Sequence, residues 1–296
     1  MKTRVFSGSG VAIVTPFGPD GSVNYEEFGR LIDWQIEQGT DCIIAAGTTG
    51  EASAMPDEEH IAVVEFAVKH TAGRVPVMAG AGSNDTRHGI HLAKCMVDVG
   101  ADALLLVTPY YNKTTQKGLY EHFAATVQDL SIPVVLYNVP SRTGLNMLPA
   151  TVARLARDFE QIVGVKECVF DQVGELKSLL GDDFSIYTGE DAVTVPVMAM
   201  GGTGVISVLA NLVPADVHQM VRLCQEGRYP EAAAMQVKAL PLIKALFSET
   251  SPIPVKYAMN RLGMSVGDGR LPLTTITDEG AARMDAALRQ YGLLSE

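Results

Sequence analysis

The sequence predicts an α/β protein: a (β/α)8 TIM barrel with a helical appendix at its C-terminus. Three observations predict this class. Short apolar, β-branched runs recur eight times, helix-like segments separate most of them, and residues 212–296 still follow the last run. Strands that alternate with helices form parallel βα units, and eight such units close into a barrel. An open doubly wound sheet is the alternative, and it is disfavoured because no G-x-G-x-x-G motif follows an early run.

The eight predicted strands are near-continuously apolar, which is typical of strands that are covered on both faces. They begin near Val11, Cys42, Val75, Ala103, Pro133, Ile162, Phe184 and Gly204. The helical spacing of apolar residues predicts helices between them at 25–38, 57–70, 89–99, 118–130 and 149–158.

Further helices are predicted after the eighth strand. The segment 214–226 has the position of the last barrel helix, and 229–247, 253–263 and 278–291 follow it. We therefore expect two domains, a catalytic barrel over residues 1–227 and a C-terminal helical domain over residues 228–296.

Composition limits the class of protein and its partners. The chain has 296 residues, of which 47% are apolar and 19% charged, as in globular proteins. The net charge of −11 argues against nucleic acid and anionic membranes as partners. No window approaches the roughly 20 apolar residues of a membrane span, and the first residues lack the apolar stretch of a signal peptide. A cytoplasmic enzyme is the expectation.

The four cysteines lie far apart and form no CxxC pair. A chain of this length does not need disulfides, so we expect free thiols in a reducing compartment. Cys42 and Cys168 lie in apolar runs and are expected in the core. His88 and His91 are spaced i, i+3 without an obvious third ligand, so no metal site is predicted.

Lys166 is the outstanding residue at the ends of the predicted strands, where a barrel carries its chemistry. Period-two alternation places Ile162, Gly164 and Lys166 on one face of the sixth strand. If that face is the barrel interior, desolvation lowers the lysine pKa and frees the amine to attack a carbonyl. Gly164 beside it is expected to leave room for a substrate. The alternative is a lysine whose ammonium reaches solvent at the strand end.

Other strand ends carry groups that suit a small carbonyl substrate. Tyr137 is either a proton shuttle beside the lysine or a packing aromatic. Thr48 and Thr49, in a glycine-flanked turn, can hold a carboxylate or cap a helix. Arg142 is either a carboxylate ligand or a solvated surface residue. Glu190 and Asp191 follow the seventh strand and argue against a phosphorylated substrate.

Together these residues resemble the dihydrodipicolinate synthase and N-acetylneuraminate lyase superfamily of class I aldolases, over about residues 8–293. The motifs that carry the resemblance are Gly47-Thr48-Thr49-Gly50-Glu51, Thr108-Pro109-Tyr110-Tyr111, Tyr137-Asn138-Val139-Pro140 and Gly164-Val165-Lys166-Glu167. Ser141-Arg142-Thr143-Gly144 resembles the synthases, because sialic acid lyases lack that arginine. The C-terminal motif Pro252-Ile253-Pro254-Val255-Lys256 also resembles the synthases.

The resemblance implies a Schiff-base-forming lyase that condenses pyruvate with L-aspartate 4-semialdehyde on the route to diaminopimelate and lysine. It implies that Lys166 forms the Schiff base and that Tyr137, Thr48 and Tyr111 relay protons, with Tyr111 reaching in from a neighbouring subunit. It further implies that Thr49 binds the pyruvate carboxylate, Arg142 the semialdehyde carboxylate, and that Gly189 and Ile206 supply backbone contacts. The implied assembly is a homotetramer, a dimer of tight dimers, and the implied chemistry needs no cofactor besides the lysine.

The resemblance also implies a site at a dimer interface where many synthases bind inhibitory lysine. The matching positions are Ala52, Ser53, Asp57, His60, Asn84, His88 and Tyr110. His88 stands where sensitive enzymes carry a glutamate, and Asp57 where some carry a histidine. We therefore expect weak or absent inhibition by lysine.

Three competing functions remain. A pyruvate aldolase that cleaves a sugar acid is disfavoured by Arg142. A non-catalytic binding protein on the same scaffold is disfavoured by the intact set of Lys166, Tyr137, Thr48 and Tyr111. A metal-dependent aldolase would need ligands that the sequence does not present.

Overall fold

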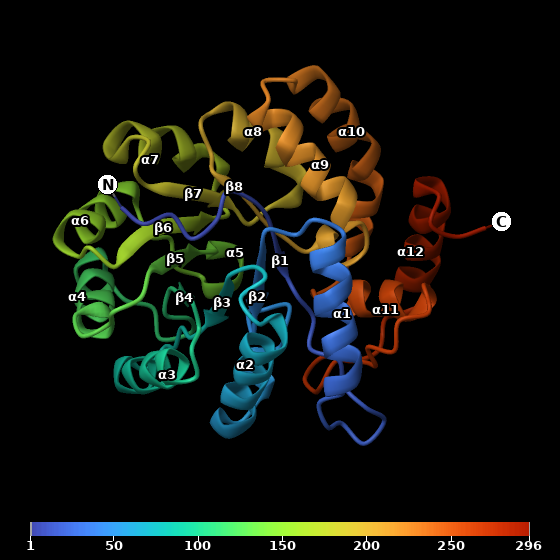
Figure 1. The fold of residues 1–296 in the computed structure, drawn as a ribbon, viewed down its shortest axis with the longest axis horizontal. Coiled ribbons are helices and arrows are strands. Elements are labelled where there is room, and N and C mark those ends of the chain that lie inside the picture. The colour runs from blue at the N-terminus through green and yellow to red at the C-terminus, as the bar shows by residue number, and fades with distance from the viewer. Residues whose placement is uncertain (1, 296) are drawn as a thin grey trace.

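The computed structural model describes residues 2–295 as a closed barrel of eight parallel strands in sequential order, β1 to β8, which confirms the predicted class (Figure 1). The strands are Gly8–Ala12, Cys42–Ala45, Val77–Gly80, Ala103–Val107, Val134–Asn138, Ile162–Glu167, Ser185–Thr188 and Gly204–Ser207. β1 closes the barrel by pairing with both β2 and β8.

Helices surround the strands and follow them in the chain. They are α1 Tyr25–Glu37, α2 Asp57–Thr71, α3 Thr86–Asp98, α4 Gln116–Val127, α5 Pro140–Thr143, α6 Pro149–Asp158, α7 Val173–Leu180, α8 Thr194–Ala199, α9 Pro214–Gln225, α10 Tyr229–Leu246, α11 Ile253–Arg261 and α12 Asp278–Tyr291. All nine segments predicted as helices are helical, with ends shifted by a few residues. α3 begins earlier than predicted, because Asp85 accepts hydrogen bonds from the backbone N–H groups of Arg87 and His88 and caps the helix.

Two regions of the sheet differ from the prediction. The first strand begins at Gly8, before the apolar run at Val11, because small residues are needed there. A Cβ on Gly10 would lie 2.8 Å from the ring of Phe6, which fills the end of the barrel. The Phe6 ring stacks on Tyr187 at a centroid distance of 4.4 Å.

The second difference is a bulge in β6. Val134 pairs with Ile162, but Val135 pairs with Gly164, so Val163 is an extra residue. Ile162 therefore packs in the cluster outside the barrel, whereas Val163 packs in the interior cluster. The prediction that Ile162 shares a face with Lys166 is wrong, because the bulge breaks the alternation between them.

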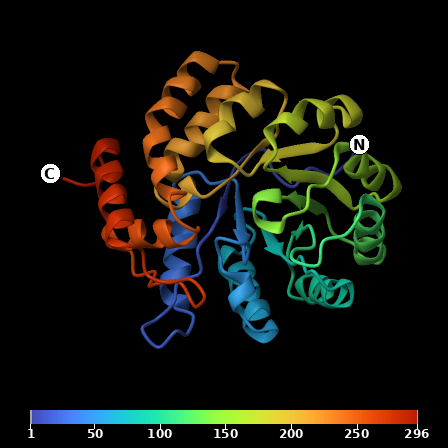
Figure 2. The ribbon, with the colours of Figure 1, turned by 180° about the vertical axis from the view of Figure 1, so that it is seen from behind.

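The C-terminal helices form one continuous layer with the barrel helices. α10 packs against α8, α9 and α12, and α11 packs against α12. In both views α12 lies at the edge of the molecule (Figures 1 and 2). Within residues 2–295, no helix combines the length and the apolar character needed to cross a bilayer.

Candidate active site

Lys166 lies inside the barrel near the end of β6. Its Cα is in register with those of Tyr137 on β5 and Tyr187 on β7. Only 6% of the residue is exposed, and its Nζ lies 4.4 Å from the centroid of the Tyr137 ring. The lysine head group therefore ends against an aromatic side chain, not in bulk solvent.

Burial lowers the pKa of Lys166 below the ordinary lysine value, and the nearby Arg142 adds to the shift. Cys168, Asp191 and Glu190 act in the opposite direction. A lowered pKa increases the fraction of neutral amine at neutral pH, and the neutral amine is the nucleophile in imine formation. The site thus activates this lysine by desolvation.

Tyr137 is as buried as the lysine, and burial raises the pKa of its phenol. The nearby Thr48 side chain opposes this shift. The phenol therefore keeps its proton at neutral pH and can donate it to a reacting oxygen. Thr48 follows β2 and is exposed.

Gly189 leaves the space that the Lys166 side chain occupies. A Cβ at this position would lie 2.8 Å from Cε of Lys166 and 2.4 Å from Sγ of Cys168. Gly164 has a different role from the one expected, because a Cβ there would lie 2.7 Å from the carbonyl oxygen of Ser185 on β7. Its missing side chain allows close strand packing and does not make room for a substrate. Ile206 is fully buried in the interior cluster.

The prediction that Cys168 lies in the core is wrong. Cys42 is fully buried in the barrel interior, but Cys168 is half-buried and lies beside Lys166. Burial raises the pKa of the Cys168 thiol to about 12, so it stays a neutral thiol at neutral pH. Its position two residues after Lys166 on an alternating strand was the signal for its place in the site.

The two carboxylates after β7 have different environments. Asp191 accepts hydrogen bonds from the Ser207 hydroxyl at 2.5 Å and from the backbone N–H groups of Val208 and Leu209, both at 3.0 Å. It therefore joins the loops after β7 and β8. Glu190 is half-buried, and burial raises the pKa of its carboxyl.

Thr49 and Arg142 lie on two separate segments at the mouth. Thr49 is 4% exposed in the turn after β2, and the Thr15 hydroxyl donates to the carbonyl of Gly50 in that turn at 2.7 Å. Arg142 belongs to α5 and is exposed. One of its guanidinium nitrogens, Nη2, donates to the carbonyl of Ser251 at 3.3 Å.

Tyr111 is the one expected catalytic residue that its own chain does not bring to Lys166. It is 93% exposed and has a left-handed backbone, with φ 69°. Such a backbone is unfavourable for a residue with a side chain and is often found at functional positions.

The positions matching the lysine site gather where α2, α3 and the loop after β4 meet. His88 Nε2 lies 2.9 Å from Asp57 Oδ1, and its Nδ1 lies 2.9 Å from the Ser83 hydroxyl. His60 Nε2 lies 2.8 Å from the carbonyl oxygen of Gly80, and Asn84 donates to the carbonyl of Tyr110 at 3.1 Å. Ala52 and Ser53 form the 3-10 turn Ala52–Ala54 that precedes α2.

Sequence reasoning missed a buried polar cluster on the outer side of β5 and β6. Glu167 accepts hydrogen bonds from the Asn138 side chain at 2.8 Å, the backbone N–H of Val169 at 2.8 Å and the Gln172 side chain at 3.2 Å. Burial raises the pKa of Glu167 to about 7. The signal was a carboxylate within an apolar strand, which needs buried donors. Among the described residues, no group of three or more His, Cys, Asp or Glu side chains is arranged to hold a metal ion.

Comparison with known proteins shows which family and which relatives the chain resembles. Residues 5–291 match the Dihydrodipicolinate synthetase family. The 4-hydroxy-tetrahydrodipicolinate synthase of Acetivibrio thermocellus is 54% identical, over 99% of this chain and 100% of the relative.

Solved structures are similar to this chain over nearly its whole length. The dihydrodipicolinate synthase of Acinetobacter baumannii complexed with pyruvate has a TM-score of 0.95 at 40% identity, covering 98% of this chain and 100% of that one. The enzyme of Cyanidioschyzon merolae with lysine bound has a TM-score of 0.96 at 36% identity, covering 99% and 100%. The chain belongs to the dihydrodipicolinate synthetase family.

Proposed function

We propose that this protein condenses pyruvate with L-aspartate 4-semialdehyde, in the cytoplasm, as a step toward diaminopimelate and lysine. The observation that supports it most is Lys166, a buried lysine with a lowered pKa that faces Tyr137 inside the barrel. Membership of the family and the full-length similarity to named synthases give the substrates. Residues 1–227 would form the catalytic unit and residues 228–296 its helical support.

The proposed reaction begins at the Lys166 amine. The neutral amine adds to the carbonyl carbon of pyruvate, and loss of water leaves an imine. Tyr137 and Thr48 transfer the protons that this step requires. Loss of a proton from the methyl carbon gives an enamine, which forms a carbon–carbon bond with the aldehyde carbon of the semialdehyde. The amino group of the condensed semialdehyde then displaces Lys166, closes the ring and regenerates the free lysine.

The remaining residues would hold the two substrates. Thr49 would bind the pyruvate carboxylate through its hydroxyl and backbone N–H, and Gly189 and Ile206 would contact the substrates through their backbones. Arg142 would bind the semialdehyde carboxylate, for which a guanidinium fork is well suited. No further cofactor is needed, because the lysine supplies the electrophilic imine.

The test is turnover with both substrates. The protein is incubated with pyruvate and L-aspartate semialdehyde, coupled to the downstream NADPH-dependent reductase, and NADPH loss is followed. Rapid loss that requires pyruvate supports the synthase reaction. If there is no loss while borohydride still traps pyruvate on Lys166, the aldolase chemistry stands and sugar acids become the substrates to test.

Mixing inactive subunits should restore activity if Tyr111 serves the site of a neighbouring subunit in a dimer of dimers. A Lys166→Ala subunit supplies an intact Tyr111 to the intact lysine of a Tyr111→Phe partner. Each variant alone should be nearly inactive, and random reassembly of an equal mixture should recover about one quarter of wild-type activity, because half of the dimers are mixed and half of their sites are complete.

The matched control is a mixture of Lys166→Ala with Tyr137→Phe. Both residues act within one chain, so no complete site can form and no activity should return. Recovery in this control, or none in the Tyr111 mixture after subunit exchange has been verified by mass spectrometry, would contradict the shared site.

Lysine should inhibit weakly or not at all. The Asp57 carboxylate is already paired with the His88 imidazole, which also contacts Ser83. A bound lysine would have to break this arrangement, and it would find no glutamate at residue 88 for its ammonium. Initial rates over a lysine titration check this, with His88→Glu as the variant expected to gain sensitivity. Strong inhibition of the wild type at sub-millimolar lysine would disprove it.

A further inference from the structure

Two buried lysines lie near the mouth of the barrel, and only one is explained by the proposed chemistry. Lys256, on α11, is 1% exposed. Its Nζ lies 2.6 Å from Oε1 of Glu51 and donates to the carbonyl of Asp268 at 3.1 Å. Burial lowers the pKa of Lys256, whereas its pairing with Glu51 acts in the opposite direction. Both lysines lie over an aromatic ring, but Lys256 is also held by two oxygen partners.

Glu51 connects this ion pair to the substrate-binding turn. It follows Thr48, Thr49 and Gly50 directly and has a left-handed backbone, with φ 59°. Its backbone N–H donates to the carbonyl of Thr48 at 3.1 Å. The Glu51 backbone is therefore part of the turn that carries both threonines.

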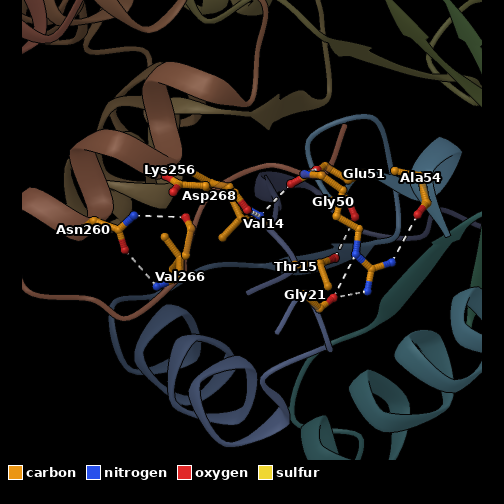
Figure 3. A network of polar contacts seen from close by, with 12 residues as sticks. Val14, Thr15, Gly21, Gly50, Glu51, Ala54, Lys256, Asn260, Val266 and Asp268 are labelled. Carbon is orange, nitrogen blue, oxygen red and sulfur yellow. Dashed lines mark hydrogen bonds and ion pairs between the residues drawn. The ribbon is translucent and has the colours of Figure 1, made fainter. Parts of the chain in front are cut away.

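Both oxygens of the Glu51 carboxylate contact residues of the C-terminal region. Oε2 accepts from the backbone N–H of Arg270 at 2.8 Å. Oε1 faces the Lys256 ammonium and accepts no hydrogen bond from any other described residue. Figure 3 shows Lys256 and Asp268 on one side of Glu51 and Gly50, with Thr15 below the turn. Loss of Lys256 would leave a buried oxygen without a partner, a costly arrangement.

The surroundings of the ion pair are also fixed. The Phe17 ring contacts two cations, with Lys256 Nζ at 4.0 Å and the Arg270 guanidinium carbon at 4.1 Å from its centroid. The Arg270 side chain donates to the carbonyls of Gly21 and Ala54 and pairs with Glu59. The far side of the turn is closed, because a Cβ on Gly50 would lie 3.2 Å from the backbone of Ala46 and Ile13.

The same C-terminal segment reaches the other substrate residue. Ser251, just before α11, accepts a hydrogen bond from Arg142. The helix α11 therefore contacts Glu51, next to the Thr48–Thr49 turn, through Lys256, and the loop before it contacts Arg142 of α5 through Ser251.

We propose that Lys256 and Glu51 are positioning residues, whose buried ion pair holds the Thr48–Thr49 turn in the geometry that binds the pyruvate carboxylate. This inference rests on the proposed function. In this proposal the C-terminal helical region is needed for pyruvate binding, although the region supplies no group that touches the substrate.

The test separates pyruvate binding from the later steps. In the double variant Glu51→Gln/Lys256→Met both charges are removed together, so no unpaired buried charge remains. We expect kcat/KM for pyruvate and the rate of borohydride trapping to fall by about tenfold, because misplacement of one binding group costs on the order of 1.4 kcal/mol in this step. The value of kcat/KM for the semialdehyde should change by less than about threefold, since Arg142 keeps its contact.

Two other variants keep the test decisive. Lys256→Arg retains the charge and is expected to fold, with a smaller loss confined to kcat/KM for pyruvate. Arg261→Met removes the ion pair of Arg261 with Asp285, at 3.1 Å, which joins α11 to α12 away from the turn. This control should lower the melting temperature slightly and leave both kcat/KM values unchanged.

The outcomes are distinct from those of the proposed function. If wild-type protein turns over but the folded double variant and Lys256→Arg keep kcat/KM for pyruvate within about twofold, the ion pair is only structural and the positioning role is wrong. If kcat/KM for pyruvate and kcat/KM for the semialdehyde both fall in proportion to the fall in melting temperature, the effect is general destabilisation and the positioning role is again wrong. If the wild type itself does not react with pyruvate, the proposed function fails first.

Discussion

Replacing Lys166 with alanine should abolish turnover and covalent labelling by pyruvate. In the proposed mechanism the amine nitrogen is the atom that bonds to pyruvate, so its removal takes away the reaction path and not merely a binding contact. We expect a loss on the order of 10⁴-fold or more, the scale seen when a covalent nucleophile is removed. The coupled assay gives the rate, and mass spectrometry after borohydride reduction locates the label.

A second substitution at this position separates chemistry from folding. Burial lowers the pKa of Lys166, so the folded state binds this proton more weakly than the unfolded state does. The cost in stability is therefore absent above the unfolded pKa, grows as the pH falls, and is complete below the folded pKa. Lys166→Met removes that cost, so its melting temperature at neutral pH should equal or exceed that of the wild type.

A second buried lysine of the same chain is the control for trapping by borohydride. Lys256 is equally buried but paired with Glu51, so it should carry no label. The wild-type trapping rate should rise with pH and level off at a lower pH than an ordinary lysine with a pKa of about 10.5 would require. Turnover within about tenfold of the wild type in Lys166→Ala, or a label on Lys256, would contradict the assignment.

The parts of the fold that follow from local patterns could be predicted from the sequence. Eight apolar runs separated by helical stretches imply the barrel, because each strand and helix carries its own periodicity. α7 and α8 were not predicted, because eight and six residues are too few to show a helical period. The Gly8–Gly10 start of β1 was missed because its two glycines reflect close neighbours in space, Asp41 beside Gly8 and the Phe6 ring beside Gly10, which local propensity does not encode.

The candidate site also has features that could be predicted from the sequence and features that could not. The place of Lys166 near a strand end is a local property, and the structure puts it inside the barrel. The reasoning from alternation was nevertheless incomplete, because the bulge at Val163 changes the face between Ile162 and Lys166. The ion pair of Glu51 with Lys256 joins two distant motifs, and nothing in either segment alone indicates its partner.

Tyr137→Phe should reduce kcat by about 10²- to 10⁴-fold, the range expected when a general acid–base group is lost. The phenylalanine ring can occupy the same space beside the Lys166 ammonium, so packing is preserved while the exchangeable proton is removed. Imine formation should become slow, but borohydride should still label Lys166 after long incubation. The expected signature is therefore a slower rate with an unchanged site of labelling.

Tyr187 supplies the matched control, because both tyrosines flank Lys166 in register on neighbouring strands. The Tyr187 hydroxyl donates to the carbonyl of Phe6 at 2.7 Å, and burial raises the pKa of this phenol to about 12. Tyr187→Phe should therefore lose about 1 kcal/mol of stability, the typical value of a buried hydrogen bond, with little change in kcat. Equal losses of kcat in the two variants would contradict a proton-transfer role for the Tyr137 hydroxyl, because the proposed mechanism gives the Tyr187 hydroxyl no part in the reaction.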